Sequence, residues 1–142
     1  MIDTIVKAGE NFCIHQIRLP YEVVENVESL RTLIAFIDIH TNEDAAYRVY
    51  IAAELPFVQR VSQLFLEEDE SDEATLIDMA LETVNLIVGS AKVLAQESGE
   101  ISFEIKTPVF ETIDTFAYDY DQAKVIKVQE DSLIIAIKEI DG

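Results

Sequence analysis

Hydrophobic and polar positions change their period along the chain, and each period predicts a kind of element. Residues 32–39 (TLIAFIDI) and 46–53 (AYRVYIAA) are rich in β-branched and aromatic side chains, and the polar residues 40–44 between them predict a hairpin. Residues 1–10 are expected to form a helical turn or two. Residues 11–19 alternate imperfectly between polar and apolar positions, which predicts a strand that Pro20 interrupts and residues 21–25 extend.

Two helical patterns follow the predicted hairpin. The first begins at Leu55-Pro56, with proline near the first helical position, and runs to about Leu66. The acidic residues 67–72 are interpreted as a solvated loop. A long helix is then expected over about residues 72–97, with Ser71 as its N-cap and Gly99 placed to end it.

The last third of the sequence has the two-residue period of strands. Residues 101–105, 109–116, 124–128 and 133–140 form four such runs, and residues 129–132 between the last two favour a hairpin. A β-rich beginning, two helices and a β-rich end predict an α+β fold, with helices packed on an antiparallel or mixed β-sheet. We expect residues 1–142 to form a single domain.

Composition limits the partners of this domain. The chain has 142 residues, of which 49% are hydrophobic, and a formal net charge of -18. A surface this negative repels phosphate backbones and anionic headgroups, so nucleic acid and membrane partners are disfavoured. The single cysteine, Cys13, cannot form an internal disulfide, and no apolar stretch of membrane-spanning length is expected. A cytoplasmic location is the default expectation.

One edge of the long predicted helix carries a polar stripe. With about 100° per residue, five residues lie within about 40° of Asp78: Glu82, Asn85, Gly89, Lys92 and Gln96. Solvent exposure alone explains most such stripes. Asparagine is a mediocre helix former, however, and glycine costs about 1 kcal/mol in a helix interior. Asn85 and Gly89, one turn apart, therefore suggest close approach by another backbone or domain.

The spacing of these residues resembles a family signature. Asp78-x3-Glu82-x2-Asn85, followed after twenty-two residues by Pro108, is similar to the pattern of the CheC/CheX/FliY chemotaxis phosphatases. The continuation Asn85-x3-Gly89-x2-Lys92 looks like that of CheX proteins. CheC and FliY members usually carry two Glu-x2-Asn motifs, whereas this sequence has one, so the resemblance favours a CheX-like phosphatase domain.

The resemblance implies a reaction and a set of roles. The substrate is the aspartyl phosphate of a CheY-type response regulator, and that receiver domain carries the Mg2+, so no cofactor of this chain's own is expected. Asn85 orients the attacking water, and Glu82 pairs with the receiver's active-site lysine. Asp78 is auxiliary, at the rim of the contact. Pro108 fixes the backbone beside the helix, and Lys92 either contacts the partner or neutralises nearby carboxylates. A homodimer joined through sheet edges is also implied.

Other readings of the sequence stay open. The chain could be a non-catalytic CheX-like module that binds a receiver domain or a flagellar switch component, or a plain structural or oligomerisation domain. No Asp-x-Asp-x-Asp-Gly loop and no histidine pair at helical spacing is present, so no metal site is predicted. His15 and His40 are interpreted as ordinary strand and turn residues, Cys13 as a core residue, and 118–121 (YDYD) as a strand end or turn.

Overall fold

The computed structural model describes residues 1–27, 30–99 and 101–140. Within these ranges the chain forms one long helix, two shorter helices, a π-helical turn and seven strands. In chain order the elements are α1 (Ile2–Phe12), η1 (Cys13–Ile17), β1 (Tyr21–Val24), β2 (Arg31–Thr41), β3 (Ala46–Glu54), α2 (Leu55–Leu66), α3 (Glu73–Ser98), β4 (Phe103–Ile105), β5 (Val109–Thr115), β6 (Gln122–Val128) and β7 (Asp131–Ile140). The α+β class predicted from the sequence is confirmed.

The strands form one antiparallel sheet. Its order is β1-β6-β7-β3-β2-β4, and β5 also pairs with β2. The β2–β3 hairpin lies near the centre of the sheet and is in register from Thr32 opposite Glu54 to His40 opposite Ala46. The predicted hairpin between β6 and β7 is also present, with Val128 opposite Asp131. Long β-branched runs therefore occupy the strands that are paired on both sides, where they are buried.

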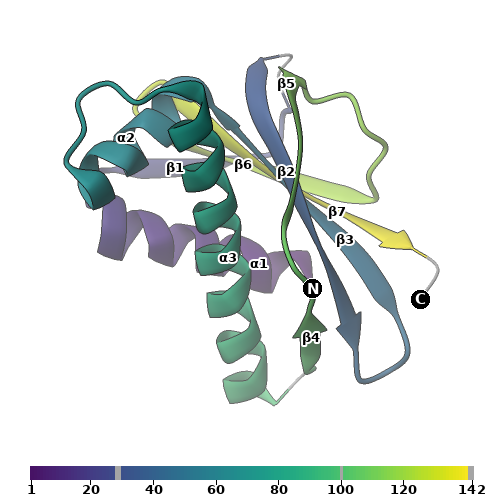
Figure 1. Ribbon diagram of the computed structural model, residues 1–142. Coiled ribbons are helices and arrows are strands. Elements are labelled where there is room, and N and C mark those ends of the chain that lie inside the picture. Colours follow the sequence, from purple (N-terminus) through teal and green to yellow (C-terminus); the bar gives the residue numbers. More distant parts are fainter. Residues whose placement is uncertain (28–29, 100, 141–142) are drawn as a thin grey trace.

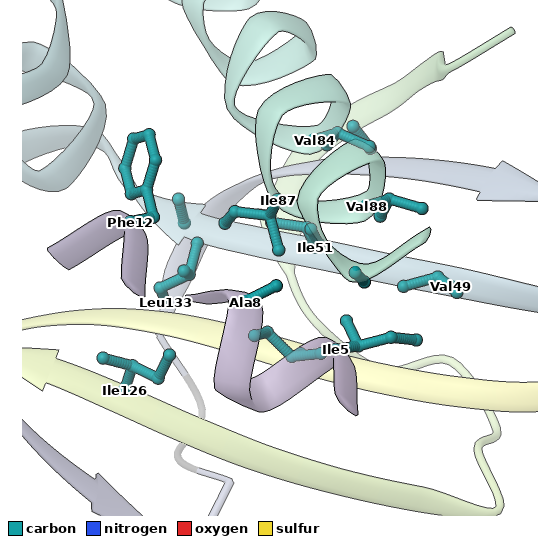
Figure 2. Close-up of a cluster of buried hydrophobic side chains, with 14 of the residues drawn as sticks. Ile5, Ala8, Phe12, Val49, Ile51, Val84, Ile87, Val88, Ile126 and Leu133 are labelled. Atoms are coloured by element: carbon teal, nitrogen blue, oxygen red, sulfur yellow. The ribbon is translucent and has the colours of Figure 1, made fainter. Parts of the chain in front are cut away.

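The three helices lie on one face of the sheet (Figure 1). Residues from α1, α3 and the sheet meet in a shared core, in which Ile5, Ala8, Ile87, Val88 and Leu133 point toward one another (Figure 2). Side chains of β2 alternate between this core and the opposite face, where Ile34 and Phe36 belong to a second buried cluster with Tyr50. Helices and sheet thus bury a common layer that fixes the orientation of α3.

The N-terminal segment departs from the sequence prediction. Residues 11–19 were expected as a strand, but α1 runs to Phe12 and η1 continues to Ile17. The buried positions of α1 recur at helical spacing: Ile2, Ile5, Val6, Ala8, Gly9 and Phe12. That period continues through the stretch that seemed to alternate. The strand prediction was wrong because a few alternating residues at the end of an amphipathic helix resemble a short strand.

Gly9 is required by the packing of α1 on the sheet. A Cβ atom at this position would lie 2.8 Å from Ile126 Cδ1 and 3.0 Å from Ile135 Cδ1. Both isoleucine side chains are fully buried, so they have little room to move. The absent side chain lets α1 lie directly against β6 and β7.

Candidate functional site: an exposed ridge on α3

Local sequence fixes both ends of α3. The Asp72 carboxylate accepts a hydrogen bond from the Thr75 backbone N–H at 2.8 Å, and this bond lowers the pKa of Asp72. Gly99 ends the helix with φ 72°, as predicted. Ser71 was the predicted N-cap, but its backbone N–H donates to Gln59 Oε1 at 2.8 Å and its hydroxyl donates to Glu68. Asp72 caps the helix because Ser71 is held by α2 and the connector.

Because one face of α3 is buried, the residues on its opposite face are exposed to solvent. Eight residues of this helix are buried: Leu76, Ala80, Thr83, Val84, Ile87, Val88, Ala91 and Ala95. Asp78, Glu82 and Asn85 lie on the other side and are exposed, as the helical period predicted. We call these three residues together with Gly89 the α3 ridge.

The polar side chains of the ridge have no partner within the described part of the chain. No hydrogen bond or ion pair engages Asp78, Glu82 or Asn85 there. Glu82 and Asn85 are three residues apart, which places them on neighbouring turns of one helix face, about 4.5 Å apart along the axis. An acceptor with a negative charge and an amide that both donates and accepts are thus presented together to solvent.

Gly89 and Lys92 extend the same edge of the helix. A Cβ atom added at Gly89 would meet nothing within 4 Å, so no contact inside the protein requires glycine there. Lys92 Nζ lies 3.5 Å from the Glu104 carboxylate of β4, and Glu104 is largely exposed. This contact agrees with the interpretation of Lys92 as a residue that neutralises a nearby carboxylate.

Pro108 lies at a break in the sheet edge beside α3. Before it, Ile105 pairs with Ile39, and after it Val109 pairs with Phe36. The two pairings differ by one residue in register, so β4 and β5 form an edge strand that is interrupted at the proline. Proline lacks the N–H needed to continue the ladder and is tolerated at an edge. The structure therefore places Pro108 between β4 and β5, at the break in this edge of the sheet.

Two exposed apolar residues on the same side of α3 were not singled out from the sequence. Leu86 is 37% exposed and Val93 is 51% exposed. A shallow cavity of about 220 Å³ separates the Leu86 end of this surface from α1 and η1. Because residues 11–19 were expected to form a strand, the sequence did not predict that this segment lies beside Leu86. The helical spacing of Ile5, Gly9 and Phe12 is the pattern that could have predicted it.

By length and composition alone, α3 also meets the requirements for a membrane span, contrary to the sequence expectation. Its most apolar window has a mean hydropathy of 1.3. The helix has no long uninterrupted apolar run, but its average hydropathy stays high although the charged residues Asp78 and Glu82 interrupt it. Core helices of soluble folds meet the same requirements, and 39% of this window is buried inside the protein.

The cysteine and the two histidines of the chain are not part of the ridge. Cys13 is buried, and its burial together with the nearby Glu10 raises the pKa of the thiol to about 11, which keeps it neutral near pH 7. His15 is exposed on η1 rather than in a strand, and His40 lies in β2 with its Nε2 3.9 Å from the Asp44 carboxylate. Among the described residues, no group of three or more His, Cys, Asp or Glu side chains could hold a metal ion.

Comparison with known proteins gives a result at the level of the fold. No protein-family model matches the sequence, and no curated protein sequence matches it. Solved structures do match. The chemotaxis protein CheX from Vibrio vulnificus is 16% identical, with a TM-score of 0.83 over 98% of this chain and 95% of that one. A CheC-like chemotactic protein from Shewanella oneidensis is 17% identical, with a TM-score of 0.78 over 98% and 97%.

A third match was solved as a complex. CheX of Borrelia burgdorferi, crystallised with CheY, BeF3 and Mg2+, is 13% identical, with a TM-score of 0.68 over 96% of this chain and 97% of that one. The likeness covers nearly the whole length of each protein. The chain therefore has the fold of the CheX and CheC-like chemotaxis proteins.

Proposed function

We propose that this chain is a CheX-like member of the CheC/CheX/FliY family that removes the phosphoryl group from the aspartate of a CheY-type response regulator. The observation that carries the proposal is the α3 ridge. Glu82 and Asn85 occupy the signature spacing, are exposed, and have no partner within the described part of the chain. A CheX protein of the same fold binds CheY, which supports a receiver domain as the partner.

Hydrolysis of an aspartyl phosphate requires few catalytic groups from the phosphatase. An aspartyl phosphate is an activated acyl phosphate, so the main task is to hold a water molecule in line with the phosphorus. The Asn85 carboxamide accepts a hydrogen bond from that water through Oδ1 and donates through Nδ2, without a charge that would repel the phosphoryl oxygens. The water oxygen bonds to phosphorus and the bond from phosphorus to the aspartyl oxygen breaks. The products are the aspartate carboxylate, inorganic phosphate and a proton released to solvent.

Glu82 holds the two proteins in register in this proposal. Its carboxylate pairs with the lysine of the receiver's active site, a charge-assisted contact that the docked proteins shield from water. Asp78, one turn earlier, contacts the rim of the same pocket. Mg2+ arrives with the receiver as part of the substrate, and this chain contributes no ligand to it.

The remaining parts of the proposal concern the oligomeric state of the protein and its location in the cell. We place the protein in the cytoplasm, without membrane insertion, because α3 carries Glu82 and Lys92 and packs its apolar face on α1 and the sheet. We also propose a homodimer through sheet edges. The edges that the described strands leave unpaired are those of β1 on one side and of β4 and β5 on the other. Light scattering tests this state, and a monomeric mass contradicts it.

The alternative function is binding without catalysis. A module that only docks a receiver domain would slow or speed phosphate loss in proportion to the complex formed. The experiment that separates the two follows phosphate release from a phosphorylated CheY-type receiver with this protein at one-hundredth of the receiver concentration. Many phosphates released per protein molecule support the phosphatase, whereas an effect limited to stoichiometric amounts supports the binding module.

A further inference from the structure

The outer side of α3 is more apolar than a solvated helix face needs to be. Leu86 and Val93 are exposed at positions i and i+7, and Gly89 lies between them with open space where a side chain would be. Exposed apolar side chains that gather on one side of a helix indicate a surface that another molecule covers.

A cavity continues this surface toward the N-terminus of the chain. It measures about 220 Å³ and lies between α3 and the segment formed by α1 and η1. Ala8, Phe12 and Leu86 supply its apolar lining, and polar residues, among them Asn11, His15 and Ser90, complete it. Apolar walls with a few polar groups suit an apolar side chain from a partner. Leu86 follows Asn85 in sequence, so the cavity begins at the ridge itself.

Charge sets this part of the molecule apart from the rest. The whole chain has a net charge of -18, but α1, η1 with its C-cap Arg18, and residues 78–92 of α3 together carry three basic residues, Lys7, Arg18 and Lys92, against four acidic ones, Asp3, Glu10, Asp78 and Glu82. The face formed by α1, η1 and the centre of α3 therefore repels an anionic partner less than the remainder of the surface does. A π-helical turn such as η1 is itself uncommon and is often found at functional sites.

We propose that Leu86, Gly89 and Val93, together with the cavity between α3 and the α1–η1 segment, form a docking surface for the receiver domain. This inference rests on the proposed function and adds the surface that provides affinity beside the residues that act on the phosphoryl group. An apolar side chain of the receiver enters the cavity. The receiver's backbone passes close to α3 at Gly89, where a side chain on α3 would hold it away.

Continuity with the ridge favours a receiver over the other possible occupants. A partner that admits Glu82 and Asn85 into its pocket must also cover the residues on either side of them, Leu86 and Gly89. A bilayer would have to take up the unpaired Glu82 carboxylate along with Leu86, which is costly. A second copy of this chain is not expected on this surface, because the homodimer proposed above uses the sheet edges instead.

The test measures affinity without turnover. The probe is a CheY-type receiver domain with beryllofluoride and Mg2+ on its aspartate, titrated into the wild-type protein and its variants. We expect Leu86→Ala to weaken binding about tenfold and Gly89→Leu to weaken it at least as much. Leu64→Ala is the matched control, because Leu64 is 46% exposed on α2 and does not line the cavity, and its affinity should stay within about twofold of wild type. Thermal melts check that each variant is folded.

The outcomes separate this inference from the proposed function. If the wild type binds the loaded receiver and Leu86→Ala changes that affinity by less than about twofold, the docking surface is overturned, whatever the phosphatase activity is. Weak binding by Leu86→Ala with no turnover by the wild type supports the docking surface and contradicts the phosphatase. A wild-type protein that binds no loaded receiver overturns both. Two further outcomes also overturn the inference. If the wild type binds phosphatidylcholine vesicles and Leu86→Ala does not, a membrane is the occupant. If the wild type self-associates and Leu86→Ala does not, a second copy of the chain is the occupant.

Discussion

Gly9 in α1 and Gly89 in α3 are both glycines in helix interiors, yet their surroundings are opposite. At Gly9 a Cβ atom would lie 2.8 Å from a buried isoleucine, and at Gly89 it would meet nothing within 4 Å. The fold therefore explains the first glycine and does not explain the second. Asn85, one turn before Gly89, is likewise exposed and without a partner in the described chain.

The contrast extends to the two regions in which these glycines lie. Around Gly9, the buried residues Ile5, Ala8 and Phe12 serve the close packing of the helix. On the α3 ridge, asparagine and glycine lower helix propensity without a compensating contact inside the molecule. Residues that cost stability and gain nothing within the fold are best explained by interactions outside it. The predictions below test whether the two regions differ in this way.

The largest expected effect is on the buried side of α3. Ile87→Ala removes a fully buried side chain that points into the core between α1 and the sheet, as Figure 2 shows. We expect the free energy of unfolding to fall by about 3–4 kcal/mol, because the fixed neighbours cannot close the cavity. Urea denaturation of the variant and of Leu64→Ala, an exposed control expected to change stability by less than about 0.5 kcal/mol, measures the difference. Equal effects for the two variants would mean that α3 is not packed as described.

Asn85→Ala is the counterpart on the ridge. Turnover of the phosphorylated receiver should fall by about 100-fold or more, equivalent to about 2.7 kcal/mol of transition-state stabilisation. The free energy of unfolding should stay the same or rise by a few tenths of a kcal/mol, because alanine is the better helix former. Single-turnover kinetics and a denaturation curve on one preparation give both values. A large loss of stability would show that Asn85 is needed by the fold, and the contrast between the regions would fail.

Glu82→Ala sharpens the division of roles within the ridge. We expect the affinity for a receiver loaded with beryllofluoride to drop about tenfold, which corresponds to about 1.4 kcal/mol, because the receiver's lysine loses its partner. Glu97→Ala removes the same charge from an exposed position near the end of α3 and serves as the control. Calorimetric titration provides the comparison. If both variants bind alike, net charge rather than a specific contact explains the role of Glu82.

The smallest expected effects come from the two glycines themselves. Gly89→Ala should raise the free energy of unfolding by up to about 1 kcal/mol, because it improves helix propensity at an open position. Gly9→Ala should lower it by about 1 kcal/mol, since overpacking against Ile126 and Ile135 outweighs the same gain. Thermal and urea unfolding of both variants measure the sign at each site. The same sign at both sites would remove the distinction on which the comparison depends.

Much of the fold could be predicted because local pattern and tertiary packing agree. The β2–β3 hairpin, α2, α3 and the end of α3 at Gly99 follow from β-branched runs, helical period and helix-ending glycine. The N-terminal segment could not be predicted in the same way. Its alternation over 11–19 is short, and the burial of Phe12, Cys13 and Ile17 comes from elements distant in sequence, including α2, whose Phe65 ring lies 6.5 Å from that of Phe12. The cavity beside Leu86 could not be predicted from the sequence for the same reason.

The candidate site divides along a similar line. Helical spacing alone predicted that Asp78, Glu82 and Asn85 share an exposed edge, because one helix determines their relative positions. The place of Pro108 at a break between β4 and β5 depends on pairing with β2, which is distant in sequence. The open space at Gly89 depends on what does not pack there, and no sequence pattern reports an absence of neighbours.

The central claim is that the α3 ridge catalyses hydrolysis in a partner's active site, and phosphate release under substoichiometric conditions tests it most directly. A phosphorylated CheY-type receiver is mixed with one-hundredth of its concentration of wild-type protein or of Asn85→Ala, and inorganic phosphate is followed with time. The account predicts many turnovers for the wild type and almost none above spontaneous decay for the equally stable variant. Equal rates for the two proteins, or a wild-type effect that stops at one phosphate per molecule, would contradict it.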